Sequence, residues 1–318
     1  MLAFLPLFLF SLLSPSLYQV TEREERRDCF FSPNGKYYAL LTYGKGNSEF
    51  VPFRAFSLRN KEGTLIWQSD SFPYTLIDLS NEGWTVGIFF DGPISGRAHL
   101  HFYDDRGRKR GEEEIGFLNA RTFSENGKIY AVLDGKNGLR IFNREGKELY
   151  RLGFGNYFAL SPDGKICALA QDTEIVFFTD GKRFQSLPLT SPFIRQMKFF
   201  QAKTIFGYLT KKDLFLYRIS EGSEIFHYAE KEPNWRLVSF DLEPDKGLVI
   251  LGRGEDKGRG EPERHTQGEV RIFDFGGKVL WRERLRYKNW NIFVPEVKFL
   301  GKNSFLVKTA EEIYEYRY

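Results

Sequence analysis

A short pattern of apolar and polar positions recurs along the chain. An apolar run enters a polar turn built from Pro, Asn, Asp, Gly and Lys, and a second apolar run leaves it. Three clear copies read FFSPNGKYYALL from Phe30, TFSENGKIYAVL from Thr122 and ALSPDGKICALA from Ala159. Turn-forming residues between two apolar runs are typical of a β-hairpin, so each copy predicts two antiparallel strands.

Fainter copies of this hairpin start at Leu79, Phe199, Leu242 and Phe299, which makes seven in total. The equivalent positions in the seven copies are Ser32, Ser80, Ser124, Ser161, Phe200, Glu243 and Leu300. They are separated by 37 to 57 residues, about the length of one four-stranded propeller blade. The sequence therefore predicts an all-β fold, a seven-bladed β-propeller.

A second hairpin follows the first in most repeats, with a glycine in its turn. Four positions after that glycine stands a large aromatic residue in four repeats: Trp67, Tyr150, Phe226 and Trp281. A large aromatic side chain at a fixed place in an outer strand predicts packing between neighbouring blades.

The last repeat stops after its third strand, within EEIYEYRY at the end of the chain. Near the other end, SLYQVTER (Ser16–Arg23) is similar to ELYRLGF, the outer strand of blade three. We therefore expect this N-terminal strand to complete blade seven and close the ring, which would cover an otherwise unpaired edge. The expected domain is a single propeller from residue 16 to 318.

Residues 1–15 are expected to lie outside that domain. An apolar run from Leu2 to Leu13 precedes the first charged residue, Glu22, and has the length of a signal-peptide core. It predicts a periplasmic or secreted protein, although an uncleaved anchor or a misplaced start codon would leave the same pattern. No other apolar stretch approaches the roughly 20 residues of a membrane span, so none is expected beyond this segment.

Composition narrows the possible chemistry. Lys and Arg number 46 against 42 Asp and Glu, and because the basic residues are scattered we expect no nucleic-acid partner. Only two cysteines occur, Cys29 and Cys167, which excludes a disulfide framework or a four-thiolate metal site. They fall in the first and fourth predicted blades, so we expect two free, buried thiols.

The SPNGK and SPDGK turns resemble those of the WD40-like and TolB-like β-propeller superfamily, which implies the fold. Two outer hairpins, KEGTLIW ending at Trp67 and FGGKVLW ending at Trp281, also resemble the PQQ-type repeat of quinoprotein propellers. That repeat has Asp where this chain has Arg59 and Phe273. The second resemblance implies an alternative function, a propeller enzyme of quinoprotein-like or lyase type with its site at the central channel mouth.

Residue types that carry catalysis form no motif in this sequence. There is no G-x-S-x-G elbow and no H-E-x-x-H zinc pair. His99 and His101 alternate along one strand and share a face, but no third metal ligand is apparent, so we expect neither metal nor cofactor. The glycine-rich, charged segment 252–269 is expected to be a long mobile hairpin loop, or alternatively a partner contact.

The expected binding surface is a rim of loops on blades six, seven, one and two. Long loops begin at Tyr43 and Asp91, and a third belongs to blade six. The crossings between blades add aromatic and basic residues suited to binding: Tyr74, Trp235, Arg236, Tyr287 and Trp290. The alternative is that the tryptophans pack inward. The sequence thus predicts a non-catalytic extracytoplasmic propeller that recognises a protein or an envelope polymer.

Overall fold

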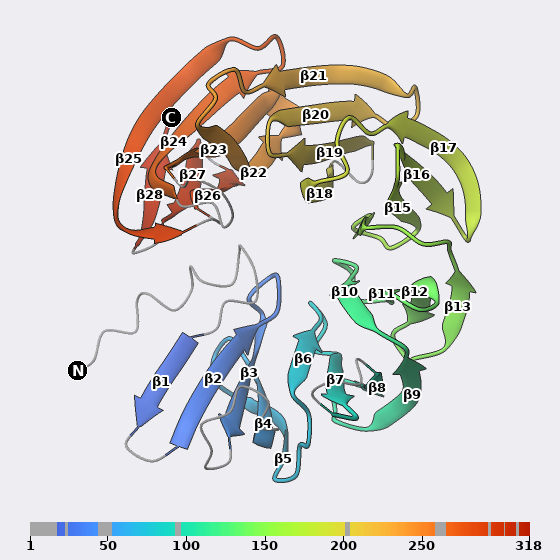
Figure 1. The fold of residues 1–318 in the computed structure, drawn as a ribbon. Coiled ribbons are helices and arrows are strands. Elements are labelled where there is room, and N and C mark those ends of the chain that lie inside the picture. The colour runs from blue at the N-terminus through green and yellow to red at the C-terminus, as the bar shows by residue number, and fades with distance from the viewer. Residues whose placement is uncertain are drawn as a thin grey trace. The chain divides into compact units, whose positions relative to one another are not determined.

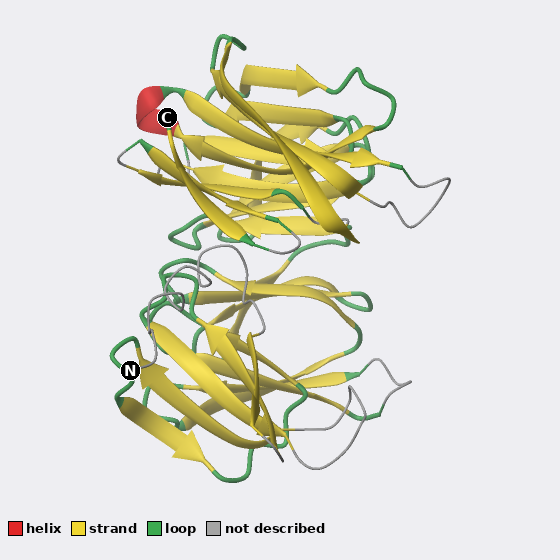
Figure 2. Ribbon diagram, turned by 90° about the vertical axis from the view of Figure 1, so that its left-hand side faces the viewer, coloured by secondary structure: helices red, strands yellow, loops and turns green. Residues whose placement is uncertain are grey.

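The computed structural model is built almost entirely from strands (Figure 1). It describes residues 18–22, 25–43, 53–92, 97–200, 204–257, 265–291, 294–301, 303–309 and 312–318. Within these residues the only helix is one 3-10 turn, Pro244–Lys246, drawn in red in Figure 2. No helix in this part of the chain has the length and apolar character needed to cross a membrane. The predicted signal segment, residues 1–15, lies outside the described residues.

Seven sheets follow one another along the chain, and we call them blades 1 to 7. Blade 1 has the order β1 (Tyr18–Glu22), β2 (Glu25–Phe31), β3 (Tyr37–Tyr43), β4 (Phe53–Asn60) and β5 (Leu65–Ser69). Blade 2 has the order β6 (Leu76–Leu79), β7 (Thr85–Phe90), β8 (Ala98–Tyr103) and β9 (Lys109–Ile115). Blade 3 has the order β10 (Leu118–Phe123), β11 (Ile129–Asp134), β12 (Gly138–Asn143) and β13 (Glu148–Arg151).

The remaining four blades repeat this plan. Blade 4 has the order β14 (Tyr157–Leu160), β15 (Ile166–Gln171), β16 (Glu174–Thr179) and β17 (Lys182–Pro188). Blade 5 has the order β18 (Ile194–Phe200), β19 (Ile205–Thr210), β20 (Asp213–Arg218) and β21 (Ser223–Ala229). Blade 6 has the order β22 (Trp235–Glu243), β23 (Leu248–Asp256), β24 (His265–Asp274) and β25 (Val279–Asn291). Blade 7 has the order β26 (Glu296–Gly301), β27 (Ser304–Lys308) and β28 (Ile313–Arg317).

The number and position of the blades confirm the predicted seven-bladed, all-β fold. Each of the seven equivalent repeat positions falls at or beside the end of the strand that enters the repeated hairpin, as at Ser32 after β2 and Ser80 after β6. The turn chemistry is local, so the repeat in the sequence fixes where each hairpin reverses.

The predicted ring-closing strand is wrong. Strand β1 pairs antiparallel with β2, from Tyr18 opposite Cys29 to Glu22 opposite Glu25, and blade 7 has three strands in the described residues. Only two residues separate β1 from β2 in the sequence. Pairing with the adjacent strand therefore costs little loop-closure entropy, whereas pairing with the last blade would close a loop of the whole chain.

The Ser and Asn residues of the repeated turns hydrogen-bond within and between blades. Ser32 Oγ accepts a hydrogen bond from the backbone N–H of Tyr37 at 3.1 Å, which stabilises the turn itself. The Asn34 N–H donates to Asn81 Oδ1 in the next turn at 2.7 Å. Asn81 Nδ2 then donates to the carbonyl oxygen of Glu125 in the third turn at 2.7 Å. The motif therefore ties the turns of blades 1, 2 and 3 side by side.

The aromatic residues predicted between blades are found there. The four residues are Trp67, Tyr150, Phe226 and Trp281. The Trp67 ring centroid lies 5.8 Å from that of Tyr103 in blade 2, and a Cβ on Gly107 of blade 2 would lie 2.6 Å from the Trp67 ring. The Trp281 ring lies 4.9 Å from Phe305 in blade 7. A Cβ on Gly181 of blade 4 would contact Tyr150 at 3.2 Å. These predictions are confirmed.

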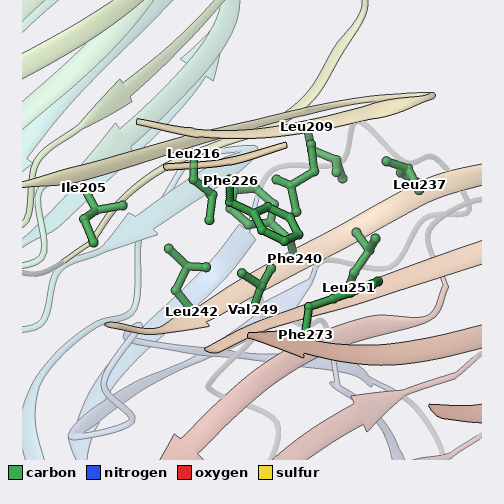
Figure 3. Close-up of a cluster of buried hydrophobic side chains, with 11 residues drawn as sticks. Ile205, Leu209, Leu216, Phe226, Leu237, Phe240, Leu242, Val249, Leu251 and Phe273 are labelled. Carbon is green, nitrogen blue, oxygen red and sulfur yellow. The ribbon is translucent and has the colours of Figure 1, made fainter. Parts of the chain in front are cut away.

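Apolar side chains fill the space between consecutive blades. Figure 3 shows the core between blades 5 and 6, where Leu216 and Phe226 face Phe240 and Val249. The ring centroids of Phe226 and Phe273 are 5.9 Å apart across this core. Similar cores join blades 1 and 2, blades 2 and 3, and blades 6 and 7, the usual way in which stacked sheets bury apolar area.

The chain divides into two compact units, with the boundary inside blade 4. The first comprises Met1–Gly155, Pro162–Cys167 and Phe178–Arg183, and the second comprises Asn156–Ser161, Ala168–Phe177 and Phe184–Tyr318. A single domain from residue 16 to 318 stays a prediction. The two cysteines, Cys29 and Cys167, are buried as expected.

Candidate functional site

Tyr74, one of the predicted binding residues, lies in the interior of the first unit. Its side chain is 3 % exposed, its hydroxyl lies 2.6 Å from His101 Nδ1, and it hydrogen-bonds the hydroxyl of Tyr103. Burial, and next the hydrogen bond with Tyr103, raise the pKa of Tyr74. This neutral phenol has almost no surface for a partner. A crossing sequence alone does not show that its ring turns inward.

The histidine pair considered as a metal site has other partners. His99 Nε2 lies 2.6 Å from Asp91 Oδ1, and His101 Nε2 lies 3.3 Å from Lys109 Nζ. Burial, and then the positive charge of Lys109, lower the pKa of His101. In the described residues no group of three or more His, Cys, Asp or Glu side chains is arranged to hold a metal ion.

Trp235 and Arg236 begin strand β22 in the second unit. Trp235 is 7 % exposed, and the Arg253 guanidinium carbon lies 4.2 Å from its ring centroid, a cation–π contact. Arg236 is partly exposed, and its Nη2 lies 3.6 Å from Asp256 Oδ2. Trp235 therefore packs inward, the alternative considered for it, while Arg236 remains accessible.

For Tyr287 and Trp290 the structure describes only the main chain, in strand β25. Along β24 and β25 the register jumps from the pair Gln267 and Arg286 to the pair His265 and Asn291. Residues 287–290 therefore form an irregularity at one end of blade 6. The same register places Trp235, opposite Glu255, at that end of the sheet. Four of the five predicted residues thus share one end of blade 6, whereas Tyr74 belongs to the other unit.

A cluster of charged side chains that the sequence did not reveal lies on one face of blade 6. At its centre Glu269 and Arg253 are both fully buried. Arg253 Nε donates to Glu269 Oε1 at 2.9 Å, and its Nη1 donates to Glu230 Oε2 at 2.7 Å. Its Nη2 lies 2.9 Å from Glu232 Oε1. The buried guanidinium is therefore surrounded by three carboxylates.

Three further arginines share the Glu269 carboxylate. Arg282 Nε donates to Oε2 at 2.7 Å, Arg284 Nε donates to the same oxygen at 3.2 Å, and Arg271 Nε donates to Oε1. Burial raises the pKa of Glu269, but the hydrogen bond from Arg282 and the charges of Arg253 and Arg271 outweigh it, so the net pKa is lowered. Glu269 is therefore a fixed anion at neutral pH.

The prediction of a mobile loop over residues 252–269 is wrong for most of that segment. Strand β23 continues to Asp256 and β24 begins at His265, while residues 258–264 lie outside the described residues. Arg253 and Glu269 are direct register partners. Because each neutralises the other, their charges do not keep the segment in solvent, and two regular strands form. One signal of the cluster was present in the sequence: arginines recur at every second position, 282, 284 and 286, as on one face of a strand.

Two exposed phenylalanines lie at one end of blade 3. Phe117 precedes β10 and Phe154 follows β13, and their side chains are 53 % and 63 % exposed. The buried Asp134 carboxylate accepts the backbone N–H groups of Phe117 at 3.0 Å and Lys136 at 2.9 Å, while Gly135 N–H donates to the Phe117 carbonyl at 2.7 Å.

The segment before Phe154 is held in the same way. The Leu152 N–H donates to the Leu139 carbonyl at 2.8 Å, and the Leu139 N–H donates to the Gly153 carbonyl at 3.2 Å. Both phenylalanines therefore stand on backbone fixed by the β11–β12 turn, one on each side of it. In the second unit Phe193, in the crossing from β17 to β18, is 70 % exposed. The predicted binding surface rests on Trp, Tyr and Arg residues in the crossings and therefore does not include these phenylalanines.

The three long loops of the predicted rim fall largely outside the described residues. These parts are residues 44–52, 93–96 and 258–264. Their predicted role in binding stays a prediction.

Comparison with known proteins supports the fold. No family model matches this sequence, and no curated protein matches it. KlHsv2, with its loop 6CD replaced by a Gly-Ser linker, is 10 % identical, with a TM-score of 0.60 over 92 % of this chain and 89 % of that chain. The Dos1 propeller is 10 % identical, with a TM-score of 0.56 over 96 % and 81 %.

The C-terminal WD40 domain of Sif2 is also similar, at 10 % identity and a TM-score of 0.59 over 93 % of this chain and 82 % of that chain. At such identities the likeness shows the fold alone, a β-propeller, which the WD40 domain of Sif2 also has. The TolB-like relationship suggested by the SPDGK turns stays a prediction.

Proposed function

We propose that this propeller is a non-catalytic scaffold that binds a protein partner. One observation carries the proposal: Phe117 and Phe154 are more than half exposed at the same end of blade 3. Exposed aromatic side chains on braced loops are typical of interface cores. Binding needs little further ordering of the backbone there, because Asp134 and the β11–β12 turn already fix it.

The test is partner capture with matched variants. The full chain is used as bait in an extract of its own organism, beside Phe117→Ser/Phe154→Ser and the control Phe184→Ser. Phe184 is 48 % exposed, but on the outer strand β17. We expect the double variant to lose the captured protein, with affinity reduced about 30-fold or more, and the control to retain it. Equal capture by the double variant, at unchanged thermal stability, would refute this surface.

Extracytoplasmic location is part of the proposal. Its support is the apolar run from Leu2 to Leu13, which has the length of a signal-peptide core. The full chain is fused at its C-terminus to an alkaline phosphatase that is active only outside the cytoplasm, with and without residues 1–15. We expect activity only with the segment present. Activity in neither fusion, with both chains intact, argues for a cytoplasmic protein.

We also propose a second surface, the rim of blades 6, 7, 1 and 2, for a protein or an envelope polymer. It is supported by Arg236, which is accessible, and by the main-chain register that brings residues 287–290 to the same end of blade 6. Thermal unfolding with envelope glycan fragments tests it. A ligand at a hundredfold its Kd adds about 2.7 kcal/mol, and Arg236→Ala/Trp290→Ala should abolish that gain. If glycan stabilises the double variant equally, the rim is not the site.

A further inference from the structure

Strand β25 is an unusually long edge strand. It has 13 residues, whereas the outer strands of the other blades have four to seven. In the described part of the chain β25 pairs with β24 alone, and Figure 1 shows it along the outer side of its blade. The edge of a long strand offers backbone N–H and C=O groups to another strand.

The side chains of β25 alternate between two faces. Trp281 and Leu285 point toward blade 7, where Leu285 is buried and Trp281 packs on the core. Successive residues of a strand face opposite sides, so Arg282, Arg284 and Arg286 project together from the other face. The packing of Trp281 and Leu285 on the blade 7 side fixes this orientation, because a slip by one residue would move both to the other face.

The buried Glu269 carboxylate orients two of these arginines, Arg282 and Arg284. Arg282 and Arg284 each direct Nε at Glu269 Oε2, yet their side chains are 45 % and 66 % exposed. A guanidinium has five N–H donors, so each keeps donors that face solvent.

The charge of this face is positive. The ion-paired cluster contains the four arginines 253, 271, 282 and 284 and the three glutamates 230, 232 and 269, which leaves one positive charge in excess. Arg286, exposed on the same face, adds a second. Because Glu269 has no exposed surface, a partner meets the guanidinium groups and not their counter-ion.

We propose that β25 receives an extended acidic segment of a protein partner as an added strand. Carboxylates at alternate positions of that segment would lie opposite Arg282, Arg284 and Arg286. Residues opposite each other on paired strands are about 5 Å apart, and alternate residues repeat every 6.6–6.8 Å or so along one face. Arg284, already opposite Glu269 in β24, would then lie between two carboxylates.

A protein segment is the occupant that both observations favour. A free phosphate or a lipid headgroup would satisfy the guanidinium groups but not the strand edge, whereas a peptide satisfies both. Charged side chains also protect edge strands from aggregation, but that role requires neither three aligned arginines nor a buried carboxylate that orients two of them. The inference rests on the proposed protein-binding function and names the partner's chemistry.

The test uses the full chain and a short fluorescent peptide with glutamate at alternate positions and Thr or Val between. Binding is measured by anisotropy at low salt, with Arg286→Glu as the variant and Lys278→Glu as the control. Arg286 lies outside the ion-paired cluster, and Lys278 lies in the exposed turn before β25. We expect Arg286→Glu to weaken binding about tenfold or more and Lys278→Glu to change it less than about twofold.

Two further peptides separate strand addition from simple charge attraction. A peptide of the same composition with consecutive glutamates should bind more weakly, and one carrying N-methyl groups along its pairing edge should not bind. Amide hydrogen exchange in β25 should slow only with the alternating peptide. Equal affinity for the N-methylated peptide would overturn the proposal, and so would Arg286-dependent binding of phosphatidylserine vesicles without binding of the peptide.

The two proposals can fail separately. If the alternating peptide does not bind while the Phe117 and Phe154 surface still captures a protein, only the strand-addition proposal is wrong. If the peptide binds but no captured protein depends on Phe117 and Phe154, the proposed blade 3 surface is wrong. The strand-addition proposal for β25 then still stands.

Discussion

Arg253 and Glu269 face each other on neighbouring strands of blade 6, and neither side chain has exposed surface. Arg253 Nε donates to Glu269 Oε1 at 2.9 Å. The pair is the inner end of a charged cluster whose outer members, Arg282 and Arg284, reach solvent. The same carboxylate therefore stabilises the interior of the blade and orients a basic surface at its edge.

Removing the central charge should strongly destabilise the second unit. Glu269→Gln removes one of the three carboxylates around the buried Arg253 and the anion that Arg271, Arg282 and Arg284 share, and breaking a buried pair costs about 3–5 kcal/mol. The control is Glu283→Gln on β25, an exposed position on the opposite face, which we expect to cost less than about 0.5 kcal/mol. Urea unfolding measures both. A loss below about 1 kcal/mol in Glu269→Gln would show that the cluster rearranges around the amide.

The contribution of Glu269 should depend on pH. Its pKa is lowered in the folded chain, so its stabilisation is complete above the ordinary glutamate pKa, about 4.3. It is lost as the pH falls through the lower folded value. The difference in unfolding free energy between the native chain and Glu269→Gln should therefore be constant from pH 7 to 5 and shrink below about pH 4. A difference that stays constant down to pH 3 contradicts this assignment.

Packing between blades 1 and 2 should not tolerate a methyl group at Gly107. This glycine has a φ of +75°, and a Cβ there would lie 2.6 Å from the rigid Trp67 ring. Gly277→Ala is the matched control, with a φ of +84° and open space around the Cβ. The control should cost about 1–2 kcal/mol for its backbone conformation, and Gly107→Ala about 1–3 kcal/mol more. Equal losses would mean that Trp67 moves aside freely.

The hydrogen bonds between turns should contribute measurably to stability. Asn81→Ala removes the acceptor of the Asn34 N–H and the donor to the Glu125 carbonyl. At about 1 kcal/mol for each net hydrogen bond, thermal unfolding should reveal a loss of about 2 kcal/mol. Glu125→Gln is the control, because Glu125 takes part through its backbone. A neutral Asn81→Ala would show that water replaces the link.

Both thiols should be inert in the folded chain. Burial raises the pKa of Cys167, and Cys29 is also buried, so neither offers an accessible thiolate. We expect maleimide to label neither cysteine at pH 8 and to label both in denaturant, as counted by mass spectrometry. Labelling of Cys167 before unfolding would reveal local opening of blade 4.

The hairpin turns are the part of the fold that local sequence predicts best. Ser32 and its equivalents could be aligned without a structure because a turn is formed by residues adjacent in the sequence. The outer-strand aromatics, such as Trp67 and Trp281, could be placed because their distance from the turn glycine is constant. The partner of the N-terminal strand could not be predicted, because the residue pattern of β1 is compatible with either blade 1 or blade 7. The short connection between β1 and β2 favours β2.

Only part of the candidate site could be predicted from the sequence. Tyr74 and Trp235 have residue types suited to binding, but burial is decided by what packs above a residue, which the crossing sequence does not contain. Phe117 and Phe154 are of a type usually buried, and their exposure follows from the path of the crossings. Arg236 is partly exposed on blade 6, and its role in binding stays a prediction.

By itself the sequence determined the all-β class, the seven repeats and the positions of their hairpins, since turn residues and alternation act within a few residues. Only the tertiary structure decided that Arg253 and Glu269, 16 residues apart, form a buried pair, and that Arg282, Arg284 and Arg286 face outward together. Strand register and the packing of Trp281 and Leu285 against blade 7 fix those contacts, and both depend on which strands become neighbours.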